Sequence, residues 1–192
     1  MRWGLPFTIL MLVLGLTGGP AVAEPLPAKN QALLLLRILA YDHKLGDRVD
    51  AKKVTIYVVH KANASESEDP ANEMVGVLRD IAKSTKLAGN AIQVVKIAYN
   101  EKSFDADIAK VKAAALWVAP SLGDSLAPIS AVTTKRKLLS FTGVAEYVNA
   151  GLSVGFSNDG GKPVISVNIP ASKNEGADLD VALLRVAKIV KK

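Results

Sequence analysis

Residues 54–60 read Val-Thr-Ile-Tyr-Val-Val-His, a continuous run of mostly apolar, β-branched side chains. Such a run is typical of a strand that is covered on both faces of a parallel sheet. Asp69 and Pro70 then provide a helix N-cap and a first-turn proline, and an apolar stripe at helical spacing follows as far as Ile81. A second β-branched run over 91–98 follows. This part of the sequence therefore predicts a strand–helix–strand unit.

The same alternation continues on both sides of this unit. Upstream, Asn30 can cap an almost wholly apolar helix that runs through Tyr41 and ends by Gly46. The predicted elements downstream are a helix over 103–111, a strand over 114–119, a helix from Ser125, a strand over 137–142 and a short helix over 144–150. Alternating strands and helices predict a mostly parallel sheet with helices on both faces.

The pattern changes after Gly151. Apolar residues alternate with small or polar ones over 152–157, the turn Asn158-Asp-Gly-Gly161 follows, and a β-branched run occupies 164–169. These features predict an antiparallel hairpin, which we expect at a sheet edge, and the spacing over 178–190 predicts a closing helix. The expected fold class is a single α/β domain: a mostly parallel sheet with helices on both faces and a C-terminal antiparallel hairpin. The hairpin and the closing helix are the expected interaction surface.

The first 23 residues have the pattern of a signal peptide. Arg2 precedes an uncharged stretch over 3–23 with an apolar core over 7–16, which is short for a membrane span. Ala21-Val22-Ala23 is a small-x-small triplet that predicts cleavage before Glu24, and the alternative is an uncleaved membrane anchor. The predicted organisation is a signal peptide over 1–23, a short tail over 24–29 and one exported domain over 30–192.

Composition excludes several classes of function. The 192 residues contain no cysteine, which removes disulfides, thiolate metal sites and cysteine nucleophiles. Two histidines leave little for a metal site or a catalytic triad, and 5% aromatic residues with scattered lysines argue against nucleic-acid binding. No common catalytic or phosphate-loop motif is present. We therefore expect no enzymatic activity, no catalytic residues, no cofactor and no metal.

A binding site is expected beyond the carboxyl ends of the parallel strands. The polar or small residues predicted at these ends are the candidate ligand-binding residues: His60, Lys61, Asn100, Ser121, Thr142 and Gly143. Such an edge could hydrogen-bond a small polar or anionic ligand with help from helix N-termini. The alternative is an ordinary set of polar loop residues, because every α/β sheet has such an edge.

From Lys135 onward the sequence resembles the YfiR-like family of exported bacterial proteins. Asn168-Ile-Pro-Ala171 and Leu183-Leu-Arg-Val-Ala187 match the last two pieces of that family's pattern, and the resemblance extends over about residues 30–192. The chain departs from the family in lacking cysteines and in carrying Ala40-Tyr-Asp-His-Lys-Leu-Gly46 where many members have an aromatic-rich helix end. The resemblance implies a periplasmic, non-enzymatic regulator of a membrane partner.

The leading functional hypothesis is thus an exported binding protein that restrains an inner-membrane signalling protein, such as a diguanylate cyclase. The alternative hypothesis is a periplasmic small-ligand-binding protein that resembles half of a substrate-binding protein. A second copy of the chain is a further candidate partner, which would give a homodimer.

Overall fold

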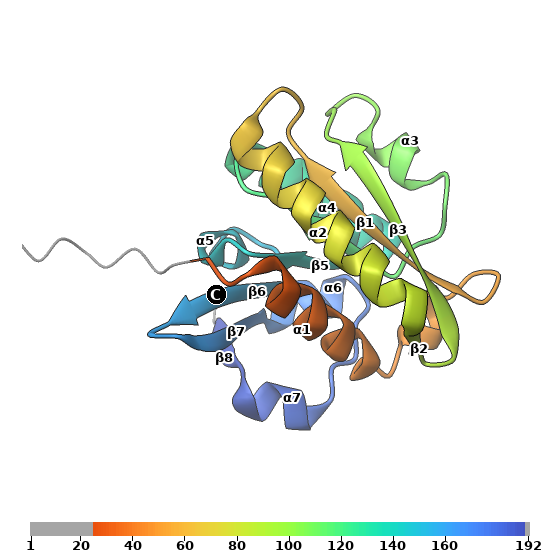
Figure 1. The fold of residues 1–192 in the computed structure, drawn as a ribbon, viewed down its shortest axis with the longest axis vertical. Coiled ribbons are helices and arrows are strands. Elements are labelled where there is room, and N and C mark those ends of the chain that lie inside the picture. The colour runs from red at the N-terminus through yellow and green to blue at the C-terminus, as the bar shows by residue number, and fades with distance from the viewer. Residues whose placement is uncertain (1–24, 191–192) are drawn as a thin grey trace, which may run out of the picture.

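In the computed structural model, which describes residues 25–190, one sheet is flanked by helices on both faces (Figure 1). Over these residues the sheet contains eight strands in the order β2-β3-β1-β4-β5-β6-β7-β8. The strands are β1 Lys53–His60, β2 Lys86–Leu87, β3 Asn90–Ala98, β4 Ala115–Val118, β5 Leu139–Thr142, β6 Val154–Asp159, β7 Lys162–Asn168 and β8 Lys188–Val190. All pairings are parallel except β2–β3 and β6–β7. The predicted α/β class and hairpin are confirmed, while the predicted signal peptide lies outside the described residues.

The helices divide between the two faces of the sheet. The described helices are α1 Ala28–Ala40, α2 Ser65–Ser84, α3 Phe104–Ile108, α4 Leu126–Arg136, α5 Ala145–Asn149, α6 Ile169–Asn174 and α7 Val181–Val186, with short 3-10 helices at Leu45–Arg48 and Gly123–Ser125. α1 and α2 pack together on one face, and α3, α4 and α5 cover the other (Figure 1).

The two-sided burial of β1 explains its sequence. Ile56 and Val58 belong to the core beneath α1 and α2, whereas Tyr57 and Val59 belong to the core beneath α3 and α4. Successive side chains of a strand point to opposite faces, so a strand in the middle of this sheet must be apolar at consecutive positions. None of the helices in the part of the chain that the structure describes is both long and apolar enough to cross a membrane.

Two helices begin earlier than predicted. α1 begins at Ala28 rather than after an Asn30 cap, because the carbonyl of Pro27 accepts the N–H groups of both Asn30 and Gln31. α2 begins at Ser65 and contains Pro70 within the helix, whereas the sequence predicted a start at Pro70. A proline removes only one helical hydrogen bond, and the acidic residues of the added first turn favour the helix dipole.

The C-terminal prediction is wrong in its detail. The unpredicted helix α6 follows β7, and instead of one helix over 178–190 the chain forms the six-residue α7 and then strand β8. β8 pairs in parallel with β7, so Val167 lies opposite Ile189 and the hairpin is one strand in from the edge. The prediction of a hairpin at the edge is therefore also wrong. The β-branched residues Ile189 and Val190 suit a strand, and β7 would otherwise leave its backbone groups unpaired.

Candidate functional site

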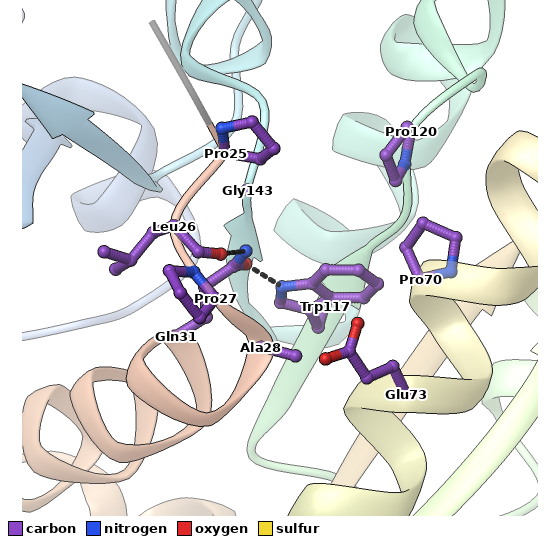
Figure 2. A pocket seen from close by; sticks show the side chains of 10 residues that line it. All are labelled: Pro25, Leu26, Pro27, Ala28, Gln31, Pro70, Glu73, Trp117, Pro120 and Gly143. Atoms are coloured by element: carbon purple, nitrogen blue, oxygen red, sulfur yellow. Dashed lines mark hydrogen bonds between the residues drawn. The ribbon is translucent and has the colours of Figure 1, made fainter.

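A pocket of about 240 Å³ lies where the topology of the sheet predicts a binding site. β1 is flanked by β3 on one side and β4 on the other. The chain therefore continues from β1 to β3 on one side and then crosses to β4 on the other side, so that the direction of strand addition changes at β1. Ligands of open α/β sheets bind at such a switch point, beyond the carboxyl ends of the strands. The pocket lies at this end of β4 and β5, between them and the N-terminal parts of α1 and α2 (Figure 2).

The inner wall of the pocket is a short chain of hydrogen bonds. The indole Nε1 of Trp117, on β4, donates to Oε1 of Gln31 at 3.2 Å, and Gln31 Nε2 donates to the carbonyl oxygen of Leu26 at 2.6 Å. All three residues are buried. Leaving any of these groups unpaired would cost about 1–3 kcal/mol, so the chain of hydrogen bonds fixes the orientation of the indole ring.

Gly143 makes this arrangement possible. A Cβ atom at this position would lie 2.6 Å from Oε1 and 2.7 Å from Nε2 of Gln31. Real Cβ atoms do not approach polar atoms so closely, and any side chain here would displace the amide from Trp117. A side chain at position 143 would therefore force the Gln31 amide to move from its place beside the backbone that follows β5.

The mouth of the pocket is apolar with one negative charge. Pro25, Pro27, Pro70 and Pro120 surround it, and among residues 25–190 the carboxylate of Glu73 on α2 is the only charged group that lines it (Figure 2). The polar atoms of the inner wall are already paired with one another. This environment suits a small apolar ligand that carries an amine, and it disfavours the anionic ligand considered from the sequence.

Of the six predicted ligand-binding residues, Gly143 lines the pocket. Thr142 is buried, and its hydroxyl donates to the carbonyl of Val118 at 3.1 Å while accepting the N–H of Val144 at 3.1 Å. The side chain of Asn100 accepts the N–H of Lys102 at 3.0 Å. The side chain of Thr142 thus joins β5 to β4 and to the turn that follows, and that of Asn100 stabilises a local turn.

The other three predicted residues lie at the same edge of the sheet but do not line the pocket. His60 is buried at the end of β1 with Nδ1 3.8 Å from Oε1 of Glu68, and Lys61 donates its backbone N–H to Oγ of Ser67 at 2.9 Å. Ser121 has a left-handed backbone with φ of 63°. The structure brings the strand ends together as expected, and ligand contact by these residues stays a prediction.

Sequence reasoning missed Gln31, Trp117 and Glu73. Gln31 and Trp117 could have been found from the sequence. Each places a polar group inside an apolar element, and a buried polar group needs a hydrogen-bond partner. Nothing in the sequence marked Glu73 among the other charges of its helix. Among the residues that the structure describes, no group of three or more metal-ligating side chains is placed to hold a metal ion.

Known structures share this fold. A domain crystallised in complex with L-Trp from Streptococcus pneumoniae has a TM-score of 0.60 and 12% identity, covering 85% of this chain and 62% of that one. A conserved domain protein from Vibrio cholerae has a TM-score of 0.61 and 15% identity, covering 86% and 60%. A substrate-binding protein with adhesive properties from Clostridium difficile, in its ligand-free, open form, has a TM-score of 0.55 and 16% identity, covering 85% and 59%. The chain spans about three fifths of the length of these proteins.

These likenesses show the fold of this chain, an α/β domain with a mostly parallel sheet and helices on both faces. The sequence model of the YfiR/HmsC-like family matches residues 28–188, and this chain belongs to that family. The resemblance noted from the C-terminal motifs is thus confirmed over nearly the whole domain. No curated protein matches the sequence significantly. Membership of the YfiR/HmsC-like family suggests a periplasmic regulator.

Proposed function

We propose that the protein is an exported, non-enzymatic binding protein that restrains an inner-membrane signalling protein, with a diguanylate cyclase as the expected class of partner. Family membership supports this proposal. A protein of this kind needs an exposed surface that a partner can cover, and the surface of α7 provides one.

The observation that carries the proposal is the exposure of large apolar side chains on and beside α7. Val181 is 62% exposed and Val186 75% exposed, although α7 has only six residues. Tyr41 is also exposed, and its carbonyl accepts the N–H of Asp180 at 2.9 Å, so the tyrosine lies next to the start of α7. We call Tyr41, Val181 and Val186 the α7 surface. Large exposed apolar side chains within one short segment of the chain are a feature of interaction sites.

The adjacent strand β8 adds a second means of binding. β8 lies close after α7 and, among residues 25–190, is the last strand in the sheet, so that within this part of the chain it pairs only with β7. An edge strand offers unpaired backbone groups to an extended segment of another chain. α7 and β8 thus support an interaction surface in the C-terminal part of the chain, as expected from the sequence. The strand at the edge is β8 and not the hairpin.

Replacing both valines of the α7 surface is the direct test. We expect V181S/V186S to reduce recovery of the membrane partner by about tenfold when the tagged protein is captured from its host, because two apolar side chains lose their burial in the complex. Deleting the gene should raise the partner's output, cyclic di-GMP for a cyclase, and V181S/V186S should fail to restore it. Capture followed by mass spectrometry and measurement of the nucleotide give the two readouts.

Leu33→Ser is the matched control, since Leu33 is an exposed apolar residue two turns before the end of α1. We expect this variant to capture the partner and to restore the output. The proposal is wrong if capture yields no membrane signalling protein and deletion changes no such output. The role of the α7 surface is wrong if both variants behave alike.

The pocket favours a second candidate function, the binding of a small molecule. Its position at the switch point and the likeness of the fold to that of a substrate-binding protein support this alternative. Ligand binding to the native state raises the melting temperature. We expect small amine-bearing metabolites to raise that of the wild type and to have no effect on Glu73→Gln, which keeps the size of the side chain and removes its charge. Equal shifts in both proteins would contradict the assigned role of Glu73.

A further inference from the structure

A second hollow lies at the amino ends of the parallel strands, whereas the pocket lies at their carboxyl ends. Two adjoining depressions of about 320 and 340 Å³ share Lys112, Ala113 and Arg136 among the residues that line them. These residues precede β4 and β5, so the depressions lie at the amino ends of those strands. We call the two together the basic cleft.

Positive charge dominates the basic cleft. Its lining contains five cationic side chains that are not part of a buried ion pair: Lys44, Lys112, Lys135, Arg136 and Lys137. One acidic side chain, Asp47, also lines it. Asp105 approaches from α3 and pairs with Lys135 and Arg136 at 2.7 Å each, and these bonds lower its pKa to about 2. Two carboxylates thus face five cations, which leaves the cleft with a clear positive excess.

Part of the cleft is held rigidly by the backbone. Lys137 ends α4 in a left-handed conformation with φ of 56°, its carbonyl accepts Nε of the buried Arg48 at 2.9 Å, and its Nζ donates to the carbonyl of Asn174 at 2.9 Å. Gly176 lets the lysine side chain pass, since a Cβ there would lie 3.2 Å from Cδ of Lys137. These contacts set the position of one cation before any ligand binds.

Two other cations are available to a ligand. Within residues 25–190, no carboxylate lies within ion-pair distance of Lys112, and Nζ of Lys44 is 4.0 Å from its nearest carboxylate, Asp47. We propose that the basic cleft is a second ligand site, which binds a phosphate group. A phosphate carries up to two charges and several acceptor oxygens, which matches a concave site with several cationic donors and an excess of positive charge. Both a soluble phosphorylated compound and a phospholipid headgroup present this chemistry.

Isothermal titration calorimetry with pyrophosphate, on the protein purified from its own host, tests the proposal. K44Q/K112Q removes two charges from exposed positions with no strong hydrogen bonds, so the fold should persist, which its melting temperature checks. We expect this variant to bind pyrophosphate about tenfold more weakly than the wild type, because charge-assisted contacts are lost. K29Q/K162Q is the matched control, with the same net charge and both changes at exposed positions outside the cleft. We expect it to bind as the wild type does.

Flotation with vesicles distinguishes the two sources of phosphate. Recruitment to phosphatidylglycerol but not phosphatidylcholine vesicles, abolished in K44Q/K112Q and kept in K29Q/K162Q, identifies a lipid headgroup as the ligand. Binding of pyrophosphate without recruitment identifies a soluble compound. The proposal is overturned if neither pyrophosphate nor the anionic vesicles bind, or if the two double variants weaken binding equally.

Discussion

Replacing Arg48 with methionine is expected to lower the free energy of unfolding by about 3–5 kcal/mol. The guanidinium of Arg48 is ion-paired with Asp42, and their side chains are only 4% and 0% exposed. Removing the cation leaves a carboxylate buried without its counter-charge. Breaking a buried ion pair from one side is costly for this reason, even though a complete pair contributes little net stability.

The effect should be large also because this ion pair joins three separate segments. Arg48 donates to the carbonyls of Lys137 and Glu175, which lie at the end of α4 and just after α6. Asp42 accepts the backbone N–H of Asp178 at 2.9 Å. The variant therefore loosens the attachment of the C-terminal segment, including α7 and β8, to the rest of the sheet.

Urea unfolding of the wild type and Arg48→Met measures the effect. Lys135→Met is the control, because it breaks an ion pair with Asp105 at an exposed position, and we expect its midpoint to change little. Adding Asp42→Asn to Arg48→Met should recover part of the loss, since the uncompensated charge is then gone. A shift for Arg48→Met no larger than that of the control would contradict the assigned role.

The sequence could predict the parts of the fold that depend on local pattern. The apolar run over 54–60 and the β-branched run over 91–98 form the parallel strands β1 and β3, as their consecutive apolar residues predict; β1 is buried on both faces, and β3 is mostly half-buried. β8 could not be predicted in this way. Residues 188–190 carry an apolar pattern that suits a helix as well as a strand, and the open edge of β7 decides between the two.

The candidate site shows the same division. Ligands of open α/β sheets bind beyond the carboxyl ends of the strands, and this rule predicted Gly143 at the end of the sheet where the pocket lies. Gln31 and Trp117 are 86 residues apart, and only the tertiary fold shows that their polar groups meet. The buried ion pair of Asp42 and Arg48 could not be predicted from the sequence either, because isolated charged residues usually lie on the surface.

Glu175 carries the second large effect. It is 1% exposed, its Oε2 accepts the backbone N–H of Ser140 at 2.8 Å and the hydroxyl of Ser153, and its Oε1 is 2.6 Å from Oγ1 of Thr133. Burial raises the pKa of this carboxyl above its ordinary value of 4.5. Thr133 has a single hydroxyl hydrogen, which also reaches the carbonyl of Ser130 at 3.0 Å. A protonated Glu175 that donates to Thr133 therefore satisfies more of this network than a carboxylate does.

The raised pKa makes stability depend on pH in a defined direction. The folded protein keeps a proton that the unfolded chain releases near the ordinary pKa of 4.5. The stability associated with this proton is therefore complete below that pH and is lost as the pH rises through the higher pKa of the folded state. Glu175→Gln keeps the hydrogen-bonding shape of the neutral acid and cannot ionise. We expect this variant to lose that pH dependence and to be at least as stable as the wild type at neutral pH.

Thermal unfolding from about pH 4 to about pH 8 distinguishes the charge of Glu175 from its contacts. Glu175→Ala should lose about 3 kcal/mol even at acid pH, because it leaves a cavity and unpairs the backbone N–H of Ser140. Glu146→Gln, at an exposed position on α5, should keep the pH profile of the wild type. A Glu175→Gln profile that follows the wild type would show that the pKa of Glu175 does not differ between the folded and unfolded states, and the assigned rise of its pKa would be wrong.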